Sequence, residues 1–204
     1  MRTRLFALVL GLLPLAGCID ADLTVEFVDD ARVETAMDMT IGRELFDLTG
    51  RSPQDVCKQG TATVGTETVT CTQREAMTLD AFIARAGQGG TDPGDRLRQV
   101  ARVERLGSDR LRVTLDFAGM AAAGGPEMAQ ARQMAGLMRA ALAGHSLVFR
   151  VRAPKIEDTT GTLSADGKAA EYVVPLGALL ADVPPAAFVT TVALKSCWFG
   201  IFCF

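Results

Sequence analysis

A strict alternation of apolar and polar residues from residue 19 onward predicts a β-hairpin. Apolar or small side chains take every second position in two runs, Ile19, Ala21, Leu23, Val25 and Phe27, then Val33, Thr35, Met37, Met39 and Ile41. A period of two is typical of strands with one buried face. Residues 29–31 supply the turn between the runs. Because a lone hairpin is unstable in water, its apolar face must pack against a helix or a second sheet.

Further along the chain, helical patterns alternate with strand patterns. Short helices are expected at residues 43–48, at 79–86 after the N-cap Thr78, and at 176–180. The longest helix is expected from Pro126 to Gly144, where apolar residues recur at i+3 and i+4 spacing.

Further strands are expected at residues 99–106, 111–117, 147–151, 170–174 and 188–194. The Asp-Gly pair in residues 164–168 is typical of a hairpin turn and is expected to join the strands at 147–151 and 170–174. About seven strands and three or four helices in mixed order predict an α+β domain. We expect a mostly antiparallel sheet with helices packed on one face.

The amino-terminal segment has the organisation of a lipoprotein signal peptide. Two arginines precede the apolar run Leu5–Leu15, which is too short to span a bilayer as a helix. The sequence Leu-Ala-Gly-Cys that ends at Cys18 resembles the lipobox of bacterial lipoprotein precursors. We therefore expect removal of residues 1–17, acylation of Cys18 with chains such as palmitate, and a single domain over residues 18–204. An ordinary cleaved signal beside an incidental cysteine is the alternative.

The charge balance changes which partners are expected. Removal of residues 1–17 takes away two of the 21 basic residues and none of the 24 acidic ones, so the net charge moves from −3 to about −5. The chain has no cluster of Lys and Arg, so we expect no nucleic-acid partner and no attraction to anionic headgroups. Membrane binding is expected to depend on the acyl anchor.

Five cysteines become an even number if Cys18 carries lipid. The other four form two close pairs, Cys57 with Cys71 and Cys197 with Cys203, and an oxidising compartment permits both disulfides. Four cysteines allow three connectivities, and we expect the local one because a hairpin or short loop can close each pair. The spacings fit no zinc pattern, so neither a metal nor a cofactor is expected.

The chain carries no motif typical of an enzyme. It has no glycine-rich phosphate loop, nucleophile elbow, HExxH or paired CxxC sequence. The single histidine, His145, could serve acid–base chemistry, but its position after Gly144 favours interaction with the end of the preceding helix. Asp92 and Asp95 lie in a glycine-rich segment without the register of an EF-hand, which favours a surface loop. We therefore expect no enzymatic activity.

Two apolar features favour contact with a lipid or a partner protein. Methionines gather on the longest helix and just before it, at Met120, Met128, Met134 and Met138. Such adaptable side chains could line a cavity for an acyl chain between helix and sheet, although ordinary core packing explains the same residues. The tail, residues 195–204, holds Trp198 and three of the ten phenylalanines. It either caps the sheet as a disulfide-closed loop or contacts the membrane interface or a partner.

These features together resemble the LppM-type bacterial lipoproteins. The similar parts are Cys18 followed directly by an Ile-x-Ala-x-Leu-x-Val strand, the central helices, and the closing hairpin at residues 163–176 with its Val-Pro-Leu ending. The motifs are generic and extend over most of the chain after residue 18. The resemblance implies an anchored α+β domain with a hydrophobic cavity, associated with lipid or glycolipid handling at the envelope. This chain departs from it in the cysteine-bounded tail, where we see no membrane-spanning helix, so only Cys18 is carried over as a functional residue.

The sequence thus favours a non-enzymatic envelope lipoprotein that binds a hydrophobic ligand between helix and sheet. The expected lining residues are Met120, Met128, Met134, Met138 and Trp198. A structural or assembly-factor lipoprotein that binds a protein partner through a sheet edge or the Trp198 tail is the alternative. Ile19 follows Cys18 where many inner-membrane lipoproteins have Asp, so the outer membrane is favoured if the source has two membranes. Asp20, at the next position, weakens that distinction.

Overall fold

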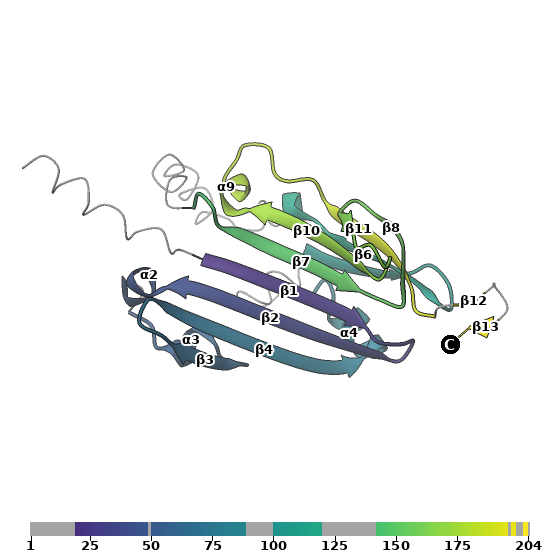
Figure 1. Ribbon diagram of the computed structural model, residues 1–204, viewed down its shortest axis with the longest axis horizontal. Helices are drawn as coiled ribbons and strands as arrows, with labels where there is room; N and C mark the ends of the chain where they lie inside the picture. The colour runs from purple at the N-terminus through teal and green to yellow at the C-terminus, as the bar shows by residue number, and fades with distance from the viewer. Residues whose placement is uncertain are drawn as a thin grey trace, which may run out of the picture.

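Strands dominate the computed structural model, which describes residues 19–48, 50–88, 100–119, 142–195, 197–198 and 202–203. They form two larger sheets and one small C-terminal pair (Figure 1). Four short helices are described, α2 (Arg43–Leu48), α3 (Pro53–Val56), α4 (Leu79–Arg85) and α9 (Leu176–Leu179). The predicted α+β class is confirmed. The helix expected at residues 126–144 lies almost wholly outside the described residues.

The larger sheet has seven strands in the order β3-β4-β2-β1-β7-β10-β9. Their bounds are β1 (Ile19–Phe27), β2 (Arg32–Gly42), β3 (Thr61–Val64), β4 (Thr68–Thr78), β7 (Ser146–Arg152), β9 (Thr162–Leu163) and β10 (Ala169–Pro175). The predicted hairpin is confirmed, because β1 pairs antiparallel with β2 from Ile19 opposite Ile41 to Phe27 opposite Val33. On its other side β1 pairs in parallel with β7, so it lies in the middle of the sheet.

The second sheet has four strands in the order β5-β6-β11-β8. Their bounds are β5 (Ala101–Arg105), β6 (Arg110–Leu115), β8 (Lys155–Thr159) and β11 (Phe188–Ala193). The sequence did not predict β8, and the turn at residues 164–168 therefore joins β9 to β10 instead of joining the strands at 147–151 and 170–174. Gly167 has a φ of 68° in this turn, a conformation that glycine adopts at little cost. The small pair is β12 (Cys197–Trp198) with β13 (Phe202–Cys203).

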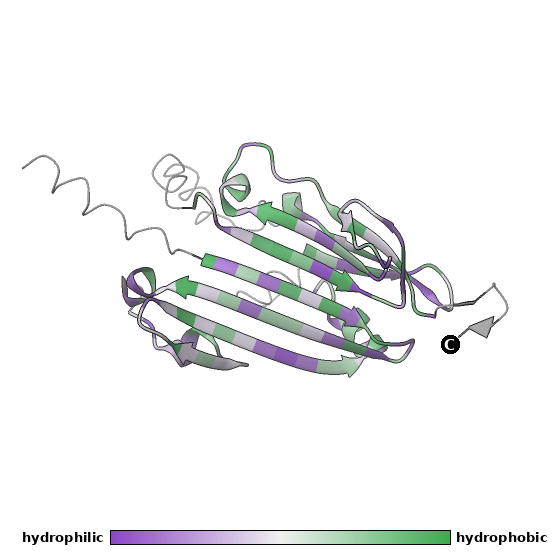
Figure 2. Ribbon diagram, viewed as in Figure 1, coloured by the Kyte–Doolittle hydropathy of each residue, from purple (hydrophilic) through white to green (hydrophobic). Residues whose placement is uncertain are grey.

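The core forms where one face of each larger sheet meets the other. Strands β1 and β2 show the alternating pattern along their length in Figure 2. Buried core side chains come from both sheets and from α4, and include Phe27, Val33, Leu79, Leu111, Phe117, Phe149, Val151, Phe188 and Val192. The predicted cap of α4 is also confirmed, since the Thr78 hydroxyl accepts the backbone N–H of Ala81 at 3.2 Å. The face of the seven-stranded sheet that carries this core is called the inner face below.

Candidate functional site

The inner face carries an apolar strip that extends from the core toward the end at which β1 begins. Ala21 lies opposite Met39 of β2 and Leu147 of β7, and Ile19 lies opposite Ile41. Successive residues of a strand point to opposite faces, so these side chains share the face of the buried Phe27. The apolar strip consists of six half-buried side chains, Ile19, Ala21, Met37, Met39, Ile41 and Leu147. It therefore begins one residue after Cys18.

An aromatic ladder borders the apolar strip on the side of the core. The ring of Phe117, which follows β6, lies 5.5 Å from Phe149 and 5.7 Å from Tyr172, and Tyr172 stacks on Phe188 at 5.4 Å. Phe149 is two residues from Leu147 on the same strand, so ladder and strip are continuous. Stacked and tilted rings at these distances stabilise one another beyond the area that they bury. The aromatic ladder therefore forms a rigid border of the apolar strip.

A disulfide borders the apolar strip on the side of β4. Cys71 lies opposite Met39 across the β2–β4 pair, and its sulfur is bonded to Cys57. Both cysteines are buried. The Gln73 side chain also donates to the side-chain oxygen of Gln59 at 3.2 Å, so the segment after Cys57 lies over the inner face of β4. This first predicted disulfide is confirmed.

At the end of the sheet nearest Cys18, the carboxylate of Asp20 joins neighbouring elements. One oxygen of Asp20 lies 2.9 Å from Nδ1 of His145, and the other accepts the backbone N–H of Ser146 at 2.9 Å. The carbonyl oxygen of His145 in turn accepts the N–H of Leu176, the first residue of α9, at 2.9 Å. The start of β1 is thus joined to β7 and α9 through polar contacts.

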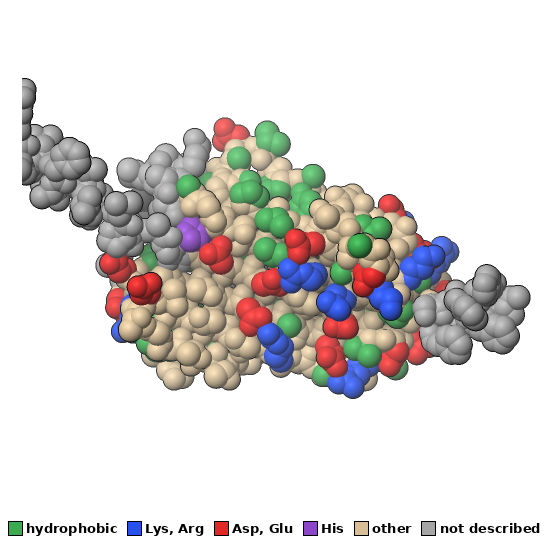
Figure 3. Space-filling model, in the orientation of Figure 1, with side chains coloured by type: hydrophobic (Ala, Val, Ile, Leu, Met, Phe, Trp, Pro, Cys, Tyr) green, Lys and Arg blue, Asp and Glu red, His purple; other side chains and the backbone are tan. Residues whose placement is uncertain are grey.

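The outer face of the seven-stranded sheet carries charges that are paired across strands. Arg150 on β7 donates to both carboxylate oxygens of Asp22 on β1 at 2.9 Å, and to Glu171 on β10 at 2.7 Å. The hydrogen bond to Glu171, more than that to Asp22, raises the pKa of Arg150 above its ordinary value despite the opposing effect of burial. Arg74 and Asp38 form a further pair at 2.7 Å. Figure 3 shows this mixture of acidic and basic side chains on the visible face.

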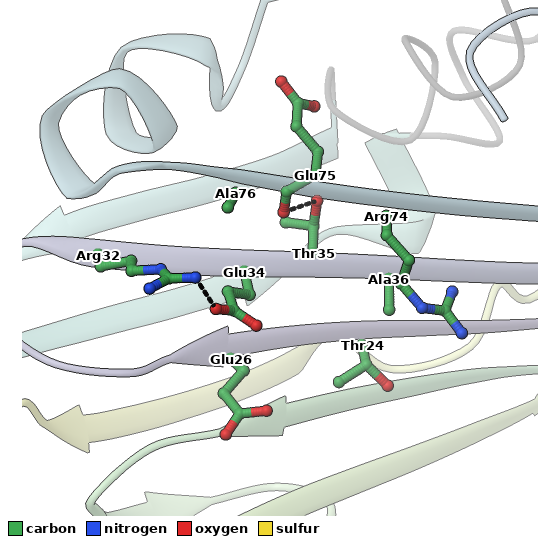
Figure 4. A pocket seen from close by; sticks show the side chains of 9 residues that line it. All are labelled: Thr24, Glu26, Arg32, Glu34, Thr35, Ala36, Arg74, Glu75 and Ala76. Atoms are coloured by element: carbon green, nitrogen blue, oxygen red, sulfur yellow. Dashed lines mark hydrogen bonds and ion pairs between the residues drawn. The ribbon is translucent and has the colours of Figure 1, made fainter.

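A shallow depression of about 460 Å³ lies on the outer face, over β1, β2 and β4 (Figure 4). The described residues that line it are Thr24, Glu26, Arg32, Glu34, Thr35, Ala36, Arg74, Glu75 and Ala76. Arg32 pairs with Glu34 at 2.5 Å, and Ala36 and Ala76 are the apolar members of this lining. A surface of compensated charges offers little to an acyl chain. The depression is therefore not the hydrophobic site that the sequence predicts.

Most of the residues that the sequence proposes for a site lie outside the described part of the chain. This holds for Cys18 and for the methionines Met120, Met128, Met134 and Met138. The backbone of Trp198 belongs to β12, but its side chain is not among those described. Cys197 lies opposite Cys203 in the backbone pairing, and the predicted disulfide between them stays a prediction.

Sequence reasoning missed that the sheet itself supplies methionines to an apolar surface. Met37 and Met39 lie on the apolar strip, next to residues of β1. The alternation in the sequence placed them on the inner face of a hairpin, and nothing in that pattern distinguished a packed core from a ligand surface. The signal that could have found them is the run of two methionines at strand spacing beside the first strand after Cys18.

Within the described residues, no group of three or more His, Cys, Asp or Glu side chains is placed to hold a metal ion. Over the same ranges, no helix is long and apolar enough to cross a membrane. The longest of the described helices, α4, has seven residues.

No protein-family model and no curated protein matches the chain. Among solved structures, the chain is similar to the NMR structure of the folded domain of LppM from Mycobacterium tuberculosis, with a TM-score of 0.46 and 10% sequence identity. The similarity covers 87% of this chain and 90% of that one. At this identity and TM-score, no residue's role follows from the similarity.

Proposed function

We propose that this protein is a non-enzymatic envelope lipoprotein, anchored through acylated Cys18, whose domain holds an acyl chain against the apolar strip. The observation that carries the proposal is the strip itself, a half-buried apolar surface that is continuous with the core and starts beside Cys18. Each buried methylene contributes about 0.8 kcal/mol, so burial of roughly ten or more methylenes of an acyl chain is needed for micromolar binding. Met37 and Met39 suit such a ligand because methionine adapts its shape to irregular apolar partners.

The distribution of charge supports binding rather than catalysis. On the seven-stranded sheet, the ion pairs of Arg150 and Arg74 lie on the outer face, whereas the apolar strip lies on the inner face. A ligand on the strip would meet methyl, methylene and thioether groups. The methionines predicted on the helix at residues 126–144 would add to this lining and stay a prediction.

Native mass spectrometry tests the ligand part of the proposal. The chain from residue 18 with Cys18→Ser, purified from cells, should carry a co-purifying lipid, and the emptied protein should take up a fluorescent fatty acid. Met39→Gln should weaken this uptake by about tenfold, because it places an amide on the apolar strip. Thr40→Gln is the matched control, since the next residue of the strand points to the outer face. Purified protein that carries no lipid and takes up no fatty acid would contradict the proposal.

Metabolic labelling with palmitate tests the anchor separately. The native chain should be labelled, and the Cys18→Ser variant should not. Fractionation of labelled cells would then test the placement in the outer membrane, which the residue after Cys18 favours for a source with two membranes. Equal labelling of the two chains would remove the anchor from the proposal.

A second candidate is an assembly or structural role through binding of a protein partner. β3 pairs with β4 only from Val69 to Thr72, and no strand among the described residues pairs with residues 73–78 of β4 on that side. Unpaired backbone N–H and C=O groups at a sheet edge can accept an extended segment of another protein. The Trp198 tail is the other proposed contact. A protein without bound lipid and without fatty-acid uptake would favour this candidate.

A further inference from the structure

Aliphatic side chains form a row across four strands at the end where β1 begins. Ile19 lies opposite Ile41, Ile41 opposite Val69, and Val69 opposite Val64 in the pairings of β1, β2, β4 and β3. Neighbouring strands lie about 4.8 Å apart, so this aliphatic row is about 14 Å long. Val64, at its edge, is 49% exposed.

The same end of the molecule carries α9 and the loop that follows it. Leu176 of α9 is joined to this end by its hydrogen bond to the carbonyl oxygen of His145, and the loop after α9 contains Val183, which is 80% exposed. Pro184 and Pro185 follow Val183 and stiffen the loop. In Figure 1 the start of β1, α2 and α9 lie at one end, and Figure 3 shows hydrophobic side chains gathered over α9, the loop and the end of β10.

The position of Cys18 fixes which end of the domain faces the membrane. Cys18 is bonded to Ile19, the first residue of β1, and consecutive Cα atoms are about 3.8 Å apart. A diacylated Cys18 therefore leaves no linker between the acyl chains and the sheet. We infer that the domain rests end-on against the bilayer, with Val64 and Val183 in contact with the lipid surface. This inference rests on the proposed anchor at Cys18.

The charges at this end favour a lipid surface without net charge. Glu44, Glu67 and Asp182 are exposed there beside the exposed base Arg51, and Arg43 is paired with Asp47 at 2.9 Å, so acidic side chains are in excess. Acidic side chains are repelled by anionic headgroups, and basic clusters are what anionic leaflets attract. The contact should therefore form on phosphatidylcholine bilayers and should weaken when anionic lipid is added.

The test uses the acylated full protein in phosphatidylcholine vesicles with brominated acyl chains, which quench nearby tryptophan. In a Trp198→Phe background, Val64→Trp and Val183→Trp each place a single tryptophan at the end proposed to face the bilayer. Val28→Trp is the matched control, because Val28 is 42% exposed and follows the last residue of β1. The nine residues of β1 separate the two ends by about 30 Å.

We expect brominated lipid to reduce the emission of Val64→Trp and Val183→Trp at least about twofold and to leave that of Val28→Trp unchanged. Two reporters in separate segments keep the test valid if one substitution prevents folding. Mass spectrometry first establishes that the amino-terminal peptide is acylated. In such protein, equal quenching at both ends, or quenching at neither end, would overturn the end-on orientation but not the proposed anchor. An amino-terminal peptide without acyl chains would instead remove the anchor, and the inferred orientation with it.

Discussion

Nδ1 of His145 lies 2.9 Å from Oδ2 of Asp20, and this contact joins the second residue of β1 to the residue before β7. Partial burial acts to raise the pKa of Asp20, but the hydrogen bonds from the Ser146 N–H and from His145 outweigh it and lower that pKa from its ordinary 3.8. The sequence placed His145 at the end of a helix and gave no indication of a carboxylate partner.

Asp20→Asn should remove part of the protein's sensitivity to acid. Because the pKa of Asp20 is lowered in the folded state, its carboxylate stabilises the fold above pH 3.8, and that contribution is lost as the pH falls through the folded pKa. Urea unfolding of both proteins from about pH 2 to pH 6 measures this. The difference in unfolding free energy between the native protein and the Asp20→Asn variant should be largest at the highest pH of this range and vanish at the lowest pH. A difference independent of pH would contradict the assignment.

Arg150→Lys should destabilise the fold by about 1 kcal/mol, because one ammonium group cannot reproduce the hydrogen bonds of a guanidinium to both Asp22 and Glu171. The Arg150 side chain is 30% exposed, so solvent screening limits the effect. Arg152→Lys is the control, since Arg152 is 52% exposed and lies 3.6 Å from Glu26. Denaturant unfolding should detect a loss of unfolding free energy only for Arg150→Lys. Equal losses for the two variants would argue against the bridge that Arg150 forms with Asp22 and Glu171.

Loss of the Cys57–Cys71 disulfide should cost about 3 kcal/mol in unfolding free energy, as expected for a crosslink between residues 14 apart. The double variant Cys57→Ser with Cys71→Ser, compared with native protein in urea, gives this value. Cys197→Ser with Cys203→Ser should cost less, because that pair closes a short segment outside the two larger sheets. Mass spectrometry of unreduced peptides should show both predicted disulfides in the native chain. Free thiols at Cys197 and Cys203 would rule out the second.

Gly161→Ala should destabilise the domain by about 1–3 kcal/mol, because a Cβ at Gly161 would press on the Glu171 carbonyl oxygen and lie 2.9 Å from the ring of Phe188. Phe188 is fully buried and cannot move aside cheaply. Gly177→Ala is the control, since an added Cβ in α9 meets nothing within 4 Å. That change should be neutral or slightly stabilising. Thermal melting of the two variants distinguishes the expectations, and similar melting temperatures would contradict them.

Elements with a strong local pattern were predictable from the sequence. The hairpin of β1 and β2 follows from its unbroken alternation, and α4 follows from the hydroxyl of Thr78 before an apolar helical run. The turn at residues 164–168 was also placed correctly, because Asp-Gly supplies the backbone conformation that it requires. The strand that leads into this turn is β9, however, and not β7 as predicted, because β8 and β9 lie between β7 and the turn.

Elements defined by distant partners were not predictable. β8 buries only Ile156 among its five residues, so its sequence lacks the alternation of a half-buried strand. Residues 73–75 of β4 are polar on both faces, and they form a strand because β2 pairs with the whole of β4. The parallel pairing of β1 with β7 begins at Ala21 and Leu147, and beside it the Asp20 carboxylate accepts the N–H of Ser146, which is 126 positions away. No local pattern encodes such a neighbour.

The candidate site was predictable only in its chemistry. Methionine was recognised as a lining for an apolar ligand, but it was sought on the helix at residues 126–144, whereas the described structure offers Met37 and Met39 on the sheet. The strip takes its form from the registers of β1 with β2 and β7, and from a disulfide and an aromatic ladder on its borders. These arise from tertiary packing, which residue spacing does not report.

The central place of β1 determines how the domain responds to mechanical load. Nine residues of β1 pair with β2, and six of its positions also pair with β7. A pull applied through Cys18 runs along the axis of this strand and loads its interstrand hydrogen bonds together in shear, instead of opening them one by one as at a sheet edge. For a Cys18 acylated as proposed, withdrawal of the acyl chains from the bilayer should therefore precede unravelling of the domain.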